Sequence, residues 1–216
     1  FNTAVGFDAG LSVTTGVNNT LIGSLAGDAI DTGGQNVAVG KASLSSATTA
    51  SDNVGLGHGA LSTLTTSARN VAIGTQALNG AMNTNSNTYN VAVGYQAGTA
   101  VTTGTLNTII GGNAGDAITE GNNNVAIGYT ALSSETLGDR NVAIGNFALE
   151  NQNNTSDTDA YNTAVGYKAG NAVTTGVRNT LVGGSAGDAL TTGNYNTALG
   201  YAALSAEDEH GASTAI

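Results

Sequence analysis

The chain has 216 residues, no cysteine and no proline, and a formal net charge of −10. Such an acidic chain lacks the basic patches that bind nucleic acid, so we expect no nucleic-acid partner. No apolar run approaches the ~18 residues of a membrane span, so we expect no membrane insertion. Hydrophobic residues make up 40% of the chain and charged residues 9%, which argues against a charged, disordered chain.

A five-residue motif, in most copies Asn-Thr/Val-Ala-Val/Ile-Gly, recurs along the whole sequence. Nine of its eleven spacings are 17 residues, and the other two are 20 and 21; its Asn stands at Asn2, Asn19, Asn36, Asn53, Asn70, Asn90, Asn107, Asn124, Asn141, Asn162, Asn179 and Asn196. A fixed period predicts a repeat architecture. We therefore expect one repeat domain over residues 1–204, with residues 205–216 as its C-terminal edge or the start of the next segment.

Alternation within the motif predicts a short strand, because residues two apart on a strand share a face. We expect the branched aliphatic residues to form an inward column: Val5, Ile22, Val39, Ile73, Val93, Ile110, Ile127, Ile144, Val165 and Val182. The middle residues should then line an outer face: Ala4, Ala38, Ala72, Ala92, Ala126, Ala143, Ala164 and Ala198. The Gly that ends every copy predicts a corner with positive φ. A second short strand and a second turn are expected to complete each coil.

These elements predict an all-β fold: a parallel β-solenoid or β-roll of about twelve 17-residue coils. A rise of ~4.8 Å per coil gives a rod of roughly 55–60 Å. The Asn residues should stack in a column, where they either hydrogen-bond as a ladder or simply tolerate a turn conformation. The small, uncharged Ala face would let rods approach one another, so we expect a homotrimer.

Two features modulate the repeat. Leu21, Ile109 and Leu181 replace the middle Ala in coils that carry Gly where other coils carry Leu, which indicates compensation of volume. The same coils contain the sequence Ala-Gly-Asp; for its Asp we favour turn stabilisation over calcium binding, because one carboxylate is a poor calcium site.

The two long spacings add polar residues within 79–89 and 150–161, which we expect to form surface loops. Loops vary without disturbing a stack, so they are our candidates for receptor contact. The candidate residues are Asn83, Asn85, Asn87, Tyr89, Asn153, Asn154, Asp157, Asp159 and Tyr161. An acidic run at Glu207, Asp208 and Glu209 is expected to be solvated surface.

Signals for enzymatic chemistry are weak. The two histidines, His58 and His210, lie far apart and have no cysteine near them, so they form no zinc-like cluster. The Gly-rich stretches lack the Lys of a phosphate-binding loop and have a turn explanation. We therefore expect no catalytic residues, no cofactor, no metal site and no enzyme activity.

The strings NVAIG, NTAVGYKAG and NVAIGYTAL resemble the repeats of the left-handed parallel β-roll in YadA-like heads of trimeric autotransporter adhesins. They resemble still more closely the NTAVGYQAL-type repeats of tail-fibre-like proteins that often end in an intramolecular chaperone domain. The resemblance extends to about Leu204 and implies obligate trimers on virions or cell surfaces. The sequence begins inside a repeat, so we expect a fragment flanked by other fibre domains.

The resemblance implies a structural or adhesive fibre segment of a virion tail fibre or cell-surface appendage, extracellular or on the virion surface, with a role in cell attachment. The head domain of a bacterial trimeric adhesin is the alternative. Its partners would be itself, flanking fibre domains, and a cell-surface receptor or glycan. A hexapeptide-type acyltransferase is disfavoured because the six-residue series fails at Asn171. An ice-binding solenoid is disfavoured because the Thr-Thr-Gly array is broken.

Overall fold

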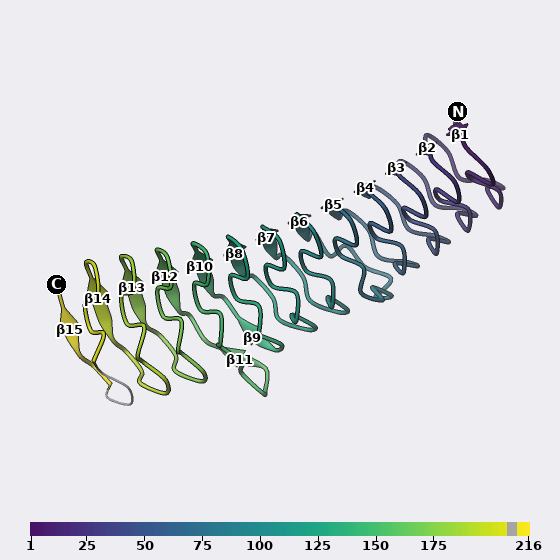
Figure 1. Cartoon of the computed structure of the whole chain (residues 1–216). Coiled ribbons are helices and arrows are strands. Elements are labelled where there is room, and N and C mark those ends of the chain that lie inside the picture. The colour runs from purple at the N-terminus through teal and green to yellow at the C-terminus, as the bar shows by residue number, and fades with distance from the viewer. Residues whose placement is uncertain (207–210) are drawn as a thin grey trace.

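The computed structural model describes residues 1–206 and 211–216, and in this part of the chain every regular element is a β-strand. Coils stack one upon another into an elongated rod, with the two termini at opposite ends (Figure 1). The acidic run Glu207, Asp208 and Glu209, together with His210, lies outside the described residues. The expectation of an all-β parallel solenoid of about twelve turns is confirmed.

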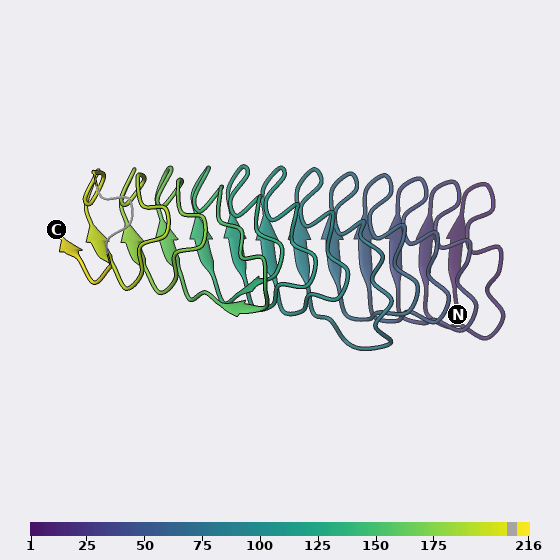
Figure 2. The ribbon, with the colours of Figure 1, turned by 90° about the horizontal axis from the view of Figure 1, so that it is seen from below.

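Each copy of the motif forms one three-residue strand that pairs in parallel with the strands before and after it. The register joins motif to motif, so that Thr3 lies opposite Thr20. Figure 2 shows the strands side by side along the rod. They are β1 (Thr3–Val5), β2 (Thr20–Ile22), β3 (Val37–Val39), β4 (Val54–Leu56), β5 (Val71–Ile73), β6 (Val91–Val93), β7 (Thr108–Ile110), β8 (Val125–Ile127), β10 (Val142–Ile144), β12 (Thr163–Val165), β13 (Thr180–Val182) and β14 (Thr197–Leu199). The two-residue strand β15 (Thr214–Ala215) extends the same sheet.

A second strand in each coil was expected, and this expectation is wrong. After the corner Gly the chain winds through tight turns in which two further positions adopt left-handed conformations, such as Gln96 at φ 53° and Gly98 at φ 60°. A strand needs extended backbone, so these turns exclude it. Parallel hydrogen bonds between coils nevertheless continue there, for example from the Gly98 N–H to the Ala114 carbonyl at 3.0 Å.

The expected inward face is also wrong. In the three-residue strands from β2 to β14 the middle residue is buried, whereas the residues on either side of it are partly or fully exposed. The middle residues of the strands, such as Ala126, therefore stack as a column in the core, and Ile127 faces outward. Three further columns complete the core: the Ala three residues after the corner, the Leu or Gly that follows it, and an aliphatic residue such as Val101 or Ile118.

Volume compensation between coils is confirmed, but it occurs inside the core. A Cβ on Gly10 or Gly27 would lie 2.7 Å from a δ carbon of Leu21. The Leu21 side chain thus fills the space that Leu occupies at these positions in other coils. Because the coil interior is narrow, a large middle residue is accommodated only where the facing residue is Gly.

The corner glycines have the expected positive φ. In all twelve copies φ lies between 128° and 141°. An added Cβ would also collide with the next coil, since at Gly94 it would lie 2.4 Å from the Gly111 carbonyl oxygen. The column therefore requires glycine for two independent reasons, backbone conformation and the close approach of the neighbouring coil.

The Asn column forms a ladder. At every step from Asn2 to Asn196 the backbone N–H of one Asn donates to the side-chain oxygen of the preceding Asn, at 2.9–3.3 Å. In most copies the side-chain amide also donates to the carbonyl 14 residues further on, as Asn107 does to Gly121 at 2.8 Å. Each Asn therefore both joins neighbouring coils and closes its own coil, while buried polar groups remain paired.

The sheet continues beyond residue 204. Strand β15 pairs with β14, and the Ser213 N–H donates to the Asn196 side-chain oxygen at 2.9 Å. Ser213 thus stands where an Asn would begin a further coil, and the stack extends through the last described residues.

Candidate functional site

The first long spacing forms an exposed polar loop on the rod. The side chains of Asn83, Asn85, Asn87 and Tyr89 are all exposed. The side-chain oxygen of Asn83 accepts a hydrogen bond from the Thr65 hydroxyl, and Asn87 forms a β-bridge with Ala68. The buried Met82 side chain and the Thr88 hydroxyl, which donates to Asn70 at 2.7 Å, anchor the loop to the coil.

The second long spacing places its expected contact residues differently. Asp157, Asp159 and Tyr161 are exposed, and Asn153 is partly buried. Asn154 is only 4% exposed, so it presents no side chain for receptor contact. Strands β9 (Gly138–Asp139) and β11 (Thr158–Asp159) pair here in parallel and join the loop to the preceding coil, on the edge of the rod away from the main sheet (Figure 1).

A buried carboxylate holds this second loop in place. Glu135 is fully buried, and its Oε1 accepts hydrogen bonds from the backbone N–H groups of residues 136, 137 and 138 at 2.7–3.2 Å and from that of Asn154 at 3.1 Å. Its Oε2 accepts from the side-chain amides of Gln152 at 2.7 Å and Asn154 at 2.9 Å. The side-chain oxygen of Gln152 in turn accepts from Asn162 of the ladder at 2.9 Å.

The role of Glu135 follows from the neighbouring coils. In the preceding coil three consecutive N–H groups, of residues 119 to 121, converge on one carbonyl of the next coil, that of Thr136, at 3.0–3.3 Å. In the next coil, the four inserted residues of the second loop displace the carbonyl that would accept from the N–H groups of residues 136 to 138 in the same way. The Glu135 Oε1 takes its place, which keeps three otherwise orphaned N–H groups paired.

This buried cluster was missed from the sequence. Glu135 and Gln152 occupy the column that holds aliphatic side chains in most other coils, such as Ile118 and Val173. Aligning the coils on the 17-residue period would have revealed two polar residues in an otherwise apolar column. Such a departure indicates either a buried network or a functional site.

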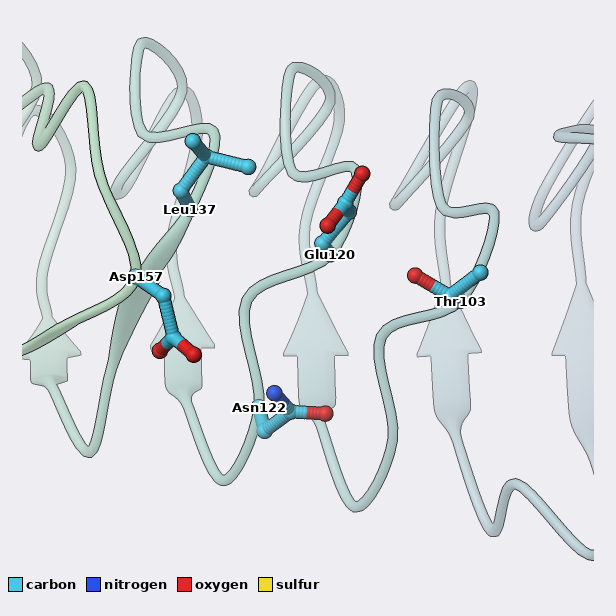
Figure 3. A pocket seen from close by; sticks show the side chains of 5 residues that line it. All are labelled: Thr103, Glu120, Asn122, Leu137 and Asp157. Carbon is cyan, nitrogen blue, oxygen red and sulfur yellow. The ribbon is translucent and has the colours of Figure 1, made fainter.

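Beside the second loop lies a shallow cavity of about 210 Å³. Thr103, Glu120 and Leu137 line it from three successive coils, and Asn122 and Asp157 complete it (Figure 3). The Asn122 side chain is fixed, because its oxygen accepts from the Thr105 N–H and its amide donates to Asp139. The cavity offers two carboxylates and one amide, which can bind hydroxyl-bearing ligands but present no activated nucleophile.

Three Arg–Tyr pairs occupy the position directly before the ladder Asn in neighbouring coils. Arg69, Arg140 and Arg178 each lie 5.4–5.6 Å from the ring centroid of a Tyr in the next coil: Tyr89, Tyr161 and Tyr195. Hydrogen bonding to the Tyr89 hydroxyl at 2.5 Å raises the pKa of the Arg69 guanidinium, with Asp52 contributing less. Arg140 also pairs with Asp159 of the second loop. These contacts stack cationic and aromatic groups along the rod edge.

Metal-binding chemistry finds no support among the described residues, which contain no group of three or more His, Cys, Asp or Glu side chains placed to hold an ion. Of the Ala-Gly-Asp residues, Asp116 accepts a hydrogen bond from Asn113 at 3.2 Å. One carboxylate oxygen of Asp28 is enclosed without a hydrogen-bond partner.

Comparison with known proteins gives no relative: no family model, no curated protein and no solved structure matches the chain. The part of the chain that the structure describes contains no helix with the length and apolar character of a membrane span.

Proposed function

We propose that this chain is a structural or adhesive segment of a trimeric fibre, displayed extracellularly or on a virion, which spaces and presents polar loops for attachment to a cell surface. A tail fibre is our first choice and the head of a bacterial trimeric adhesin our second. The proposal rests on the resemblance of the repeats and on one structural observation, the aliphatic outer face of the long sheet.

That outer face consists of two columns. The first residue of each three-residue motif strand is Thr or Val, and the third is Val, Ile or Leu, in all twelve copies of the motif. All of these side chains are at least partly exposed, and five of the third-position residues are among the exposed large hydrophobic residues of the rod: Val5, Ile22, Ile73, Ile110 and Leu199. Contiguous apolar surface of this extent is typical of a protein–protein interface.

Association through this face replaces the basis first expected for the trimer. The Ala column cannot form the interface, because it lies in the core of each rod. Three parallel rods around a common axis would bring the aliphatic faces together and remove them from water. Cyclic symmetry of this kind closes and keeps all chains pointing the same way, as a fibre requires.

The replacement Ile127→Asp tests this interface. Within a single rod the new side chain points outward, so the melting temperature of a monomer should change little. Within an aliphatic interface the carboxylate would be a buried, unpaired charge, which costs on the order of several kcal/mol. We expect a trimer for the unchanged protein at micromolar concentration and a monomer for the variant, measured by light scattering.

The matched control is Thr49→Asp, which adds the same charge at an exposed turn residue away from the sheet face. It should remain trimeric. A monomeric unchanged protein, or one that forms dimers only, would contradict the trimer, and an unaffected Ile127→Asp trimer would show that the sheet face is not the interface.

The loops are tested by shortening both to the 17-residue spacing. Removal of residues 154–157 is combined with Glu135→Ile and Gln152→Val, because the buried carboxylate would otherwise lose its partners. Three residues of the first loop, 83–85, are removed in a second step. Labelled protein is then applied to a panel of bacterial cells. We expect surface binding to be lost while the melting transition is kept; undiminished binding would rule out the loops as the contact.

A further inference from the structure

A row of exposed tyrosines follows the corner glycines in the C-terminal half of the rod. Tyr95, Tyr129, Tyr167 and Tyr201 each come directly after a corner Gly, and their exposed fractions are 55%, 51%, 55% and 87%. They stand in the coils that begin at Asn90, Asn124, Asn162 and Asn196, so that each is two coils from the next. We call these four residues the tyrosine row.

The coils between carry residues that leave the rings room. Gly112 and Gly184 hold the corresponding position in two of them, and a Cβ added to Gly112 would lie 3.6 Å from the Tyr129 ring. The same addition at Gly184 would lie 3.4 Å from the Tyr201 ring. The rings of Tyr129 and Tyr201 therefore lie against a glycine of the preceding coil. Successive rings of the row are two coils apart, which the spacing of parallel strands makes a distance of ~9.6 Å.

One further aromatic residue orders the centre of the row. Phe147, from the coil between Tyr129 and Tyr167, makes edge-to-face contacts with both, at centroid distances of 5.6 and 5.8 Å and interplanar angles of 81° and 89°. Edge-to-face contacts of this kind between aromatic rings are attractive. They restrict both rings before any ligand arrives, which reduces the entropy lost on binding.

Polar groups adjoin the tyrosine row. Gln96 directly follows Tyr95, and its side-chain amide donates to the side chain of Gln76 at 3.0 Å. Asn113, at the same position of the next coil, donates to the side chain of Asp116 at 3.2 Å. The Lys168 ammonium lies 5.6 Å from the centroid of the Tyr167 ring. The surface thus combines spaced aromatic rings with amide, carboxylate and ammonium groups that can hydrogen-bond hydroxyls.

We propose that the tyrosine row binds an extended, unbranched β-1,4-linked glycan of neutral sugars along the rod axis. The two-coil separation is close to the disaccharide repeat of such a chain, so every second sugar would meet a ring with the same orientation. The C–H face of the sugar packs on the aromatic ring, and its hydroxyls bond to the adjoining side chains. A nucleic-acid strand, the other ligand that stacks on ring arrays, would be repelled by the net charge of −10.

This inference does not rest on the proposed trimer or on the loops, because none of the four tyrosines belongs to the aliphatic columns or to the loops. Sugar binding also does not require self-association. The competing occupant of the row is a second copy of the chain. Binding to sugars and oligomeric state are therefore measured on the same samples.

The probes are cellohexaose and chitohexaose in solution, insoluble cellulose and chitin, and maltohexaose as an α-linked control. The variant Tyr129→Ala with Tyr167→Ala removes the central rings. Its control is Tyr195→Ala, which removes an exposed tyrosine that lies outside the row and outside both loops. We expect binding to at least one β-1,4-linked probe, none to maltohexaose, and a loss of about tenfold or more in the first variant only, equivalent to ~1.4 kcal/mol.

Spacing is tested by Tyr129→Asn combined with Asn146→Tyr, which keeps four rings but moves one by a single coil. This variant should bind as weakly as the one without the two rings, provided its melting temperature is unchanged. Absence of binding to all β-linked probes, equal binding by the shifted variant, or a change of oligomeric state instead of glycan binding in Tyr129→Ala with Tyr167→Ala would each overturn the proposal.

Discussion

Replacement of Gly128 by valine is expected to destabilise the stack by more than about 3 kcal/mol. Gly128 has φ 135°, a conformation that a β-branched residue strongly disfavours. A Cβ at this position would lie 2.5 Å from the backbone carbon of Gly145 in the next coil. Relief of that contact would require the two coils to separate, which would weaken the parallel hydrogen bonds between β8 and β10.

The control for this prediction is Gly112→Ala. Gly112 does not adopt a positive φ, and an added Cβ would meet only the Tyr129 ring, at an ordinary van der Waals distance of 3.6 Å. The free energy of unfolding, measured in denaturant, should change by less than about 1 kcal/mol, because the new methyl group also restricts the unfolded chain. Equal stability of Gly128→Val and the unchanged protein would show that the corner column does not require glycine.

The columns that were predicted correctly are those with a local chemical reason. A Gly in every copy indicates a backbone conformation, and the sequence alone carries that information. The repeated Asn indicated a ladder because identical amides stacked at strand spacing can bond to one another. The constant period fixed the parallel register, since only a pairing of motif with motif places all strands equivalently.

Which face of each strand points into the core could not be predicted in the same way. Alternation defines two faces but does not say which is inside, and branched aliphatic residues ordinarily indicate the core. Here the interior is so narrow that the strand contributes Ala126, while larger side chains such as Leu132 enter from the turn. That Leu132 adopts φ 54° was also not foreseeable, because left-handed backbone is uncommon for Leu.

The buried cluster escaped prediction for a different reason. Glu135 resembles any surface acid when its neighbours in sequence are considered alone. Its burial becomes evident only when it is aligned with Ile118 one coil earlier. Its function depends further on the insertion that follows, which removes the carbonyl of the next coil. Such a relation between a side chain and an absent backbone group is not encoded in any local pattern.

Replacement of Glu135 by leucine is the second change expected to have a large effect. The column is aliphatic elsewhere, so a consensus argument would predict stabilisation. The structure predicts the opposite, because six hydrogen bonds to the carboxylate would be lost together. Each buried donor left unpaired costs about 1–3 kcal/mol. Some of them would find water as the loop loosens, so we expect a total loss of more than about 4 kcal/mol.

Two further variants separate lost hydrogen bonds from altered packing. Ile118→Leu makes a volume-conserving change in the same column one coil earlier and should cost less than about 1.5 kcal/mol. Glu135→Gln keeps one acceptor oxygen for the backbone N–H groups but turns an amide toward the donors of Gln152 and Asn154. Its effect on the melting temperature should therefore lie between those of Ile118→Leu and Glu135→Leu.

The decisive test is rescue. Removing residues 154–157 restores the 17-residue spacing and allows the next coil to supply its carbonyl again, as Thr136 does for residues 119 to 121. In that shortened background, Glu135→Ile with Gln152→Val should recover at least the stability of the unchanged protein, because the column then matches its neighbours. If Glu135→Leu in the full-length chain proves as stable as the unchanged protein, or if the shortened aliphatic variant fails to recover, the carboxylate does not substitute for the displaced carbonyl.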